Sequence, residues 1–252
     1  MRPLTLLASV STTEGELQLR RRAPNEFLIT IDGRVLMASS DRRSEEAVAT
    51  LACKAIASVK APRVLIGGLG MAYTLRAALD ALPAAAHITV AELTAEVETW
   101  CRAELAPLTD GAVLDPRVTI VIGDVGRVIA TAPAGAYDAI ILDLYEGPHA
   151  TSKRPDEPFY GRIALARSYA ALSEGGVLAI WSEDINTGFA RRMTDAGFTT
   201  TVHQPGGRRA YGVYLGARAR PASPRDRPRD RPRDRDRDRG RSGGNAKGPA
   251  PR

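Results

Sequence analysis

Short apolar runs in the sequence end in glycines or in acidic residues, which are the groups that could bind a ligand. "VLIGGLG" supplies Gly68 and Gly70, "VAELT" supplies Glu92, and "VIGDV" supplies Asp124. Glycines let a ligand approach the backbone. An acid about 20 residues beyond such a turn can accept hydrogen bonds from ribose hydroxyls. Asp124 could accept a hydrogen bond from an adenine amino group, so the pattern predicts a nucleoside site.

A fourth apolar run, "AIILDLYEGP", is followed by Asp143, Tyr145 and Glu146. A single acid after a strand is commonly a helix cap or a solvated carboxylate. Acids or glycines after four successive runs, in this order, favour one shared site over four unrelated surface residues.

The elements that must position these residues alternate along the chain. Apolar strands are expected at 64–67, 88–91, 118–122, 138–142 and 177–181, with helices near 72–82, 95–105, 125–131, 160–172 and 187–196. Short, fully apolar strands between helices are typical of a parallel sheet covered on both faces. In such sheets ligands lie beyond the carboxyl ends of the strands. The predicted fold class is therefore α/β, with a doubly wound and mostly parallel sheet.

The end of the folded part distinguishes between two variants of that fold. "FTTTVH" and "AYGVYLG" are separated by Pro205, Gly206 and Gly207, which predicts an antiparallel hairpin. A terminal hairpin departs from the dinucleotide-binding fold and is expected of the methyltransferase-like fold that binds S-adenosylmethionine (SAM). The dinucleotide fingerprint G-x-G-x-x-G is also incomplete, because Tyr73 stands at its third glycine position.

The segment before the sheet has a different pattern. Residues 16–37 alternate apolar and polar positions, and Asp32-Gly33 is a hairpin signal, which predicts a small antiparallel β unit. A helix is expected to open at Ser44 and run to about Val59. The expected organisation is an N-terminal β region at 1–43, a Rossmann-like catalytic domain at 44–218 and a tail at 219–252.

The charge of the chain is concentrated in its tail. The 252 residues carry a formal net charge of +6, and residues 221–252 hold 11 Lys or Arg against 5 Asp, which accounts for all of it. The tail is Arg/Asp/Pro-rich with almost no apolar residues, so it is predicted to be disordered. Alternating Arg and Asp neutralise each other, which favours a solvated tail. Nucleic-acid binding is not expected except through this tail.

Cysteine usage and apolar runs restrict the class of protein further. Cys53 and Cys101 stand in separate segments without a C-x-x-C pattern, so neither a zinc site nor a disulfide framework is indicated. No run approaches the ~20 apolar residues of a membrane span, and the first residues do not resemble a signal peptide. We expect a soluble cytoplasmic protein that binds no metal.

Several phrases of the sequence together resemble the spermidine synthase-like family, the polyamine aminopropyltransferases. They are "VLIGGLGMAYTLRAAL", "VAELTAEV", "DPRVTIVIGDV", "YDAIILDLYEGP" and "GGVLAIWSED". Thr74-Leu75-Arg76 and the Asp115-Pro116-Arg117-Val118 lead-in are distinctive of that family. The resemblance covers residues 16 to 216 and includes the N-terminal β region.

The resemblance implies a reaction and a site. Decarboxylated SAM would donate its aminopropyl group to a di- or polyamine and leave as methylthioadenosine. Asp143 would be the general base, with Glu146 as the second catalytic acid. The residues implied for the nucleoside co-substrate are Gly68, Gly70, Glu92, Asp124, Val125 and Asp143; those for the amine are Tyr145 and Glu146. The family also implies a homodimer.

The sequence departs from the family pattern at the residues that the family uses to bind the amines. Met71 stands where the family has an aspartate that faces the donor's amino group, and Leu36 stands at a family glutamine. "SEE", at 44–46, replaces Tyr-His-Glu. A SAM-dependent methyltransferase of small-molecule amines is therefore the alternative. A non-catalytic nucleoside-binding or nucleic-acid-binding protein is disfavoured by Asp143 and Glu146, and an NAD dehydrogenase by Tyr73 and the terminal hairpin.

Overall fold

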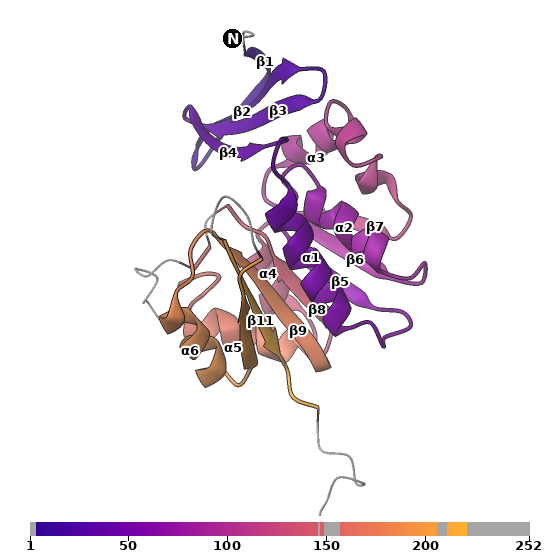
Figure 1. Ribbon diagram of the computed structural model, residues 1–252, viewed down its shortest axis with the longest axis vertical. Helices are drawn as coiled ribbons and strands as arrows, with labels where there is room; N and C mark the ends of the chain where they lie inside the picture. Colours follow the sequence, from indigo (N-terminus) through magenta and orange to yellow (C-terminus); the bar gives the residue numbers. More distant parts are fainter. Residues whose placement is uncertain (1–3, 146, 149–156, 206–210, 221–252) are drawn as a thin grey trace, which may run out of the picture. The chain divides into compact units, whose positions relative to one another are not determined.

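The computed structural model describes residues 4–145, 147–148, 157–205 and 211–220 (Figure 1). Met1–Arg220 form one compact unit that contains two sheets. The predicted tail, apart from residues 219 and 220, lies outside the described residues. The proposed division of the chain at residues 43 and 218 stays a prediction.

The larger sheet has seven strands in the order β10-β11-β9-β8-β5-β6-β7. Its strands are β5 (Arg63–Gly67), β6 (His87–Glu92), β7 (Val118–Ile122), β8 (Tyr137–Leu142), β9 (Leu172–Ser182), β10 (Thr199–His203) and β11 (Gly212–Ala217). The pairs from β9 through β7 are parallel, whereas β11 pairs antiparallel with both β9 and β10. The predicted α/β class, the mostly parallel sheet and the terminal hairpin are confirmed.

Helices cover both faces of this sheet (Figure 1). They are α1 (Arg43–Ala55), α2 (Tyr73–Ala81), α3 (Ala95–Arg102), α4 (Val125–Thr131), α5 (Arg162–Ala171) and α6 (Thr187–Asp195). Two short 3-10 turns, at Ala106–Leu108 and Ala112–Leu114, connect α3 to β7. The helix expected at 160–172 ends at Ala171, because Leu172 already begins β9.

Alternate residues of the central strands divide the core into two layers. Ile66, Ile141 and Ala179 pack on the side of α1, α2 and α3. Their neighbours Leu65 and Ile140 pack on the side of α4, α5 and α6. This period of two is the reason that the strands appear as unbroken apolar runs in the sequence.

The N-terminal sheet has four antiparallel strands: β1 (Thr5–Thr12), β2 (Gly15–Ala23), β3 (Glu26–Ile31) and β4 (Arg34–Ala38). The turn between β3 and β4 is the expected Asp32-Gly33 pair, with φ of 46° and 79°. β1 lies within the β region expected at 1–43, but the alternating pattern was recognised only from residue 16 onward, so no strand was predicted at Thr5–Thr12. One face of this sheet, through Leu17, Leu19, Phe27 and Ile29, joins the core layer of α1 and α2.

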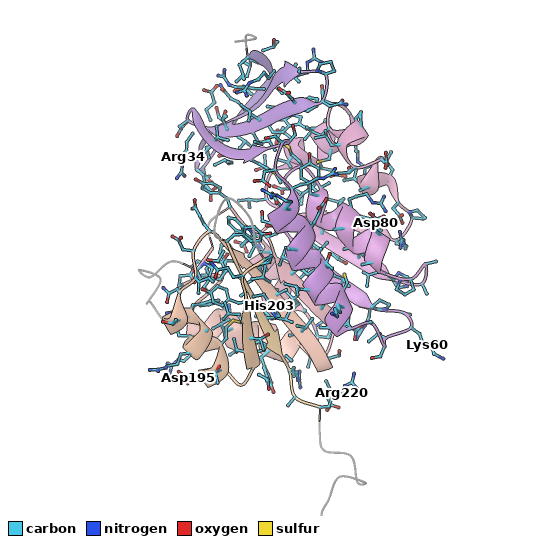
Figure 2. All side chains as sticks on the ribbon, viewed as in Figure 1. Arg34, Lys60, Asp80, Asp195, His203 and Arg220 are labelled. Atoms are coloured by element: carbon cyan, nitrogen blue, oxygen red, sulfur yellow. The ribbon has the colours of Figure 1, made fainter. Side chains whose placement is uncertain are left out.

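Helix α1 does not begin in the expected way. The cap position is Arg42, without a capping side chain, and the Ser44 hydroxyl donates to Glu45 Oε2 at 2.6 Å. The helix also ends at Ala55, before the expected Val59. Figure 2 places Lys60, beyond the end of α1, far from Arg34 of the N-terminal sheet. The first turn of α1 therefore lies toward the N-terminal sheet.

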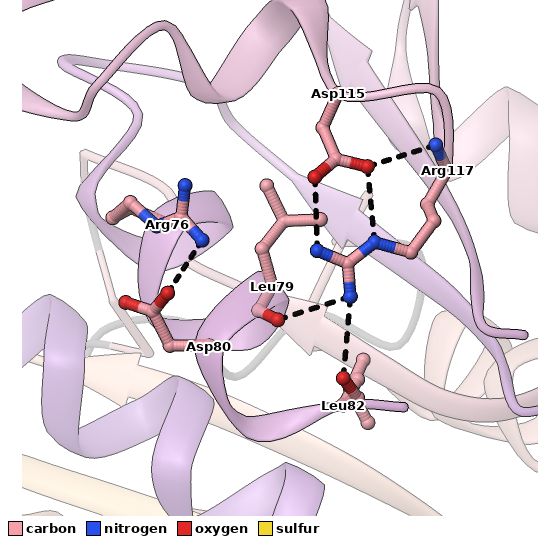
Figure 3. Close-up of polar contacts among 6 residues, drawn as sticks. All are labelled: Arg76, Leu79, Asp80, Leu82, Asp115 and Arg117. Carbon is pink, nitrogen blue, oxygen red and sulfur yellow. Dashed lines mark hydrogen bonds and ion pairs between the residues drawn. The ribbon is translucent and has the colours of Figure 1, made fainter. Parts of the chain in front are cut away.

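Two family-like phrases act as structural anchors (Figure 3). Arg117 binds both carboxylate oxygens of Asp115 at 2.9 Å and donates to the carbonyls of Leu79 and Leu82 at 3.1 and 3.2 Å. These carbonyls end α2, where a helix leaves acceptors unsatisfied. Arg117 thus connects the end of α2 to the start of β7.

Candidate active site

The glycine turn after β5 is packed against the backbone of Asp143. Gly68 has φ of 88°, and a Cβ added to it would lie 2.4 Å from the carbonyl oxygen of Asp143. The amide of Asp143 donates to the carbonyl of Gly67 at 3.0 Å. Gly70, with φ of 51°, accepts a hydrogen bond from the Cys101 thiol at 3.3 Å. Both predicted glycines therefore have a structural role that is independent of any ligand.

Glu92, the predicted ribose-binding acid, lies at the end of β6 and is 9% exposed. One carboxylate oxygen accepts from the Leu69 amide and the other from the Thr94 amide, both at 2.9 Å. Burial raises the pKa of Glu92, and these backbone hydrogen bonds oppose the shift. Each oxygen keeps a second lone pair, so Glu92 can both fix the glycine turn and accept a hydroxyl.

Asp124 and Val125 lie where β7 passes into α4. Asp124 is exposed and caps α4, since its Oδ1 accepts from the Arg127 amide at 3.0 Å. The Val125 side chain is buried against Gly67. The predicted contact of Val125 with a ligand could therefore involve only its backbone.

Two exposed apolar residues flank these acids and were not predicted. Leu93 is 57% and Ile122 is 46% exposed, and both stand at the ends of the paired strands β6 and β7. Apolar side chains beside a solvated carboxylate suit the face and the amino edge of a purine. Their position directly next to Glu92 and Gly123 in the sequence is the signal that could have identified them.

Asp143 lies one residue beyond β8 and is only partly accessible. The Thr74 hydroxyl, from the first turn of α2, donates to its Oδ2. Burial, together with the negative charge of Glu45, raises the pKa of Asp143 from 3.8 to about 7, and the Thr74 hydrogen bond opposes this shift. Near neutral pH, this carboxylate can accept a proton.

The residues around Asp143 come from distant segments. The register of β8 and β9 ends at Leu142 opposite Ile180, so Asp143 and Trp181 are the next neighbours. The Trp181 indole N–H is buried and has no hydrogen-bond partner among the described residues. Glu45, from α1, was not predicted as a site residue; it was expected only within "SEE", the segment that opens a helix and departs from the family pattern.

The N-terminal sheet contributes to the same region. The Arg34 guanidinium lies 4.7 Å from the ring centre of Tyr145, a predicted substrate residue that is 41% exposed. The Met71 amide lies 3.3 Å from Met37 Sδ, and the Met71 side chain is fully buried. The Tyr73 hydroxyl donates to the Ser39 carbonyl at 3.1 Å. The sheet therefore contacts the residues on both sides of the site.

Some predictions fall outside these contacts. Glu146, predicted as the second acid, lies outside the described residues. Within the described part of the chain, no group of three His, Cys, Asp or Glu side chains is placed to hold a metal ion. Among the helices described, none is long and apolar enough to cross a membrane.

Comparison with known proteins supports the family resemblance at the level of sequence. No protein-family model matches the chain. Putrescine N-methyltransferase 1 of Nicotiana tabacum is 33% identical over 123 residues, which cover 49% of this chain and 31% of that protein. Spermidine synthase 1 of Pisum sativum is 37% identical over 71 residues, which are 28% of this chain and 20% of that protein. The chain thus spans about a third or less of the length of these curated relatives.

Solved structures give the same result for the fold. The crystal structure of spermidine synthase from Thermotoga maritima aligns with a TM-score of 0.68 at 20% identity, over 85% of this chain and 73% of that chain. A spermidine synthase in complex with the transition state analogue AdoDATO aligns with a TM-score of 0.67 at 20% identity. The chain therefore has the methyltransferase-like fold of the spermidine synthases and is similar in sequence to spermidine synthases and putrescine N-methyltransferases.

Proposed function

We propose that this protein is a transferase that moves an alkyl group from an adenosyl sulfonium to an amine. The observation that carries the proposal is Asp143, a carboxylate at the carboxyl end of a central strand, with a pKa of about 7 and a hydrogen bond from Thr74. A base of that pKa is matched to neutral pH. Asp143 takes the proton of the attacking amine as the new N–C bond forms; the C–S bond breaks, and its electron pair returns to sulfur.

The nucleoside half of the site supports an adenosyl donor. Leu93 and Ile122 offer apolar surface for a purine, and Asp124 has a second carboxylate oxygen beside the one that caps α4. Glu92 stands at the end of the neighbouring strand with lone pairs for ribose hydroxyls. These residues hold and orient the donor, which places its reactive carbon in line with the amine.

Decarboxylated SAM is the first candidate for the donor and a di- or polyamine for the acceptor, which makes this an aminopropyltransferase. The spermidine synthase fold over 85% of the chain favours it. The homodimer implied by the family stays part of this proposal.

Methyl transfer from SAM to an amine is the second candidate, and two observations favour it. The curated relatives that match over 123 residues are putrescine N-methyltransferases. Met71 occupies the position of the family's aspartate that faces the donor's amino group, and its side chain is buried beside Met37. This position therefore has no negative charge that could pair with the ammonium of an aminopropyl group.

A product assay tests the proposal and separates the two donors. The full chain is incubated with SAM or decarboxylated SAM and a panel of di- and polyamines, and products are identified by mass spectrometry. Methylthioadenosine together with an amine that has gained an aminopropyl group establishes the first candidate. S-Adenosylhomocysteine and a methylated amine establish the second. Failure to form either product with any amine of the panel would refute the proposal.

A further inference from the structure

We propose that Glu45, in the first turn of α1, is a specificity-determining residue that binds the second cationic nitrogen of the acceptor while Asp143 faces the attacking nitrogen. This inference rests on the proposed function, because it assigns the acceptor of that reaction. Glu45 stands in the segment "SEE", where the sequence departs from the family pattern. The acceptor would be an amine with at least two cationic centres.

The position of α1 brings Glu45 to the same site as Asp143. The Arg42 guanidinium, at the start of α1, lies 5.9 Å from the ring centre of Tyr73, and the hydroxyl of the next residue, Thr74, donates to Asp143. These contacts place the first turn of α1 beside Asp143, and the negative charge of Glu45 raises the pKa of that carboxyl. Tyr73 of α2 and Tyr211, just before β11, are affected by the charge of Glu45 in the same direction. The Tyr211 hydroxyl donates to the Arg43 carbonyl at 3.3 Å, which joins the first turn of α1 to β11.

Glu45 has no basic side chain as an ion-pair partner among the described residues, because the neighbouring arginines pair with other acids. At the start of α1, the cap residue Arg42 pairs with Glu46 at 2.9 Å, and Arg43 pairs with Asp41 at 3.3 Å. Within the described residues, neither Glu45 nor Asp143 forms an ion pair. The two basic side chains nearest in sequence are therefore already used by other acids.

Glu45 and Asp143 together form a pair of negative charges in a partly buried site. Burial raises the pKa of Glu45, and Asp41 and Glu46 add to the shift, although a hydrogen bond from Ser44 opposes it. The charge of Glu45 disfavours the ionised form of Asp143. A ligand with two ammonium groups can neutralise both carboxylates, whereas a ligand with one ammonium group can neutralise only one of them.

Aromatic side chains complete a surface that suits such a ligand. Trp181 is the neighbour of Asp143 across β8 and β9, and Tyr73 and Tyr211 lie within the electrostatic reach of Glu45. The face of an aromatic ring attracts an ammonium group. Two carboxylates with aromatic rings near each of them favour a diamine over a monoamine.

Calorimetric titration at pH 8, with methylthioadenosine present, tests the assignment. The ligands are 1,4-diaminobutane and 1-aminobutane, which differ by one ammonium group, and the proteins are the wild-type chain, Glu45→Gln, Glu45→Asp and Glu46→Gln. Glu46→Gln is the matched control, since it removes the same charge from the next residue of the same helix. Circular dichroism and thermal melting confirm that each variant is folded.

We expect the wild-type chain to bind the diamine at least about tenfold more tightly than the monoamine. Glu45→Gln should weaken diamine binding by about 10- to 100-fold, the usual effect of a lost hydrogen bond to a charged group. It should leave the monoamine nearly unchanged, so that the preference for the diamine disappears. Glu45→Asp should restore part of the preference, and Glu46→Gln should keep all of it.

Three results would overturn the assignment: equal affinity of the wild-type chain for the two ligands, wild-type diamine binding by Glu45→Gln, or an equal loss in Glu46→Gln. The product assay distinguishes this failure from that of the proposed function. If product forms while Glu45→Gln keeps the wild-type preference, the function stands and the role of Glu45 does not. If the preference depends on Glu45 but no alkylated amine forms, the binding site stands and the reaction does not.

Discussion

Replacement of Asp143 by asparagine should make the protein more stable and almost inactive at the same time. The folded chain holds the proton of Asp143 more tightly than the unfolded chain, because its pKa rises from 3.8 to about 7. The stability that this group contributes is full below pH 3.8 and is lost as the pH rises to about 7. At about 1.4 kcal/mol per pH unit, the ionised form costs on the order of 4 kcal/mol.

The side chain introduced by Asp143→Asn would carry no charge at any pH, and its amide oxygen can still accept the hydrogen bond from Thr74. The free energy of unfolding of this variant should therefore match that of the wild-type chain near pH 4 and exceed it increasingly up to pH 8, by at most about 4 kcal/mol. For a domain of this size, that limit corresponds to a melting temperature about 10 °C higher. Turnover should fall by ~10²–10⁴-fold, as for a lost general base.

Asp138 of the same strand provides the control with the opposite sign. Burial raises the pKa of Asp138, but hydrogen bonds from Arg63 and Ser173 outweigh it and lower the pKa. Its contribution to stability is present above the ordinary pKa and is lost as the pH falls, so Asp138→Asn should lose about 1–3 kcal/mol at pH 7 with turnover unchanged. Urea titrations at pH 4, 6 and 8 measure both variants. A stability difference for Asp143→Asn that does not grow with pH, or a turnover equal to the wild type, would refute the reasoning.

Three further substitutions or truncations test other parts of the structure. Gly68→Ala should lose about 2–5 kcal/mol in urea unfolding, because its Cβ would lie 2.4 Å from the Asp143 carbonyl at φ of 88°. Glu92→Gln should weaken methylthioadenosine binding by about 10- to 100-fold in calorimetry, since an amide group cannot accept from both Leu69 and Thr94; unchanged affinity would argue against a ribose contact. Removal of residues 221–252 should leave melting temperature and turnover intact, and a large loss of either would show that the tail does more than its composition predicts.

The strands that carry the proposed nucleoside half of the site could be predicted from the sequence, because each is a short apolar run. The expected 118–122 strand is β7 without change, and the other parallel strands differ at their ends. Burial on both faces leaves a strand few alternatives to an unbroken apolar pattern. The residue that follows each run then lies at the ligand edge of the sheet whatever the details of packing.

The parts that the sequence did not predict are those with a weaker pattern. Strand β1 is half-exposed along its length and pairs only with β2 at the edge of its sheet, so its residues show no clear alternation. Ser44 followed by two glutamates is typical of a helix cap. In the structure, the Ser44 hydroxyl instead donates a hydrogen bond to the Glu45 side chain, and the helix has already begun at Arg43.

The proposed amine half of the site could not be predicted for a different reason: its residues are brought together only by tertiary packing. Tyr211 and Arg43, which join β11 to α1, are 168 residues apart in the chain. Arg34 of the N-terminal sheet reaches Tyr145, and Glu45 acts on Asp143 from α1. None of these pairs has a spacing that marks it in the sequence.

This difference between the two halves follows from the way the fold is built. The proposed adenosyl half lies at the ends of adjacent strands, where Gly68 must remain a glycine to let the backbone of Asp143 approach. A change there would disrupt the sheet as well as the site. The first turn of α1 is free of that requirement, because Arg42 and Arg43 are paired with Glu46 and Asp41, and Glu45 forms no ion pair among the described residues. A residue at such a position can change with little cost to folding, so the choice of acceptor amine can change there while the base and the nucleoside site are kept.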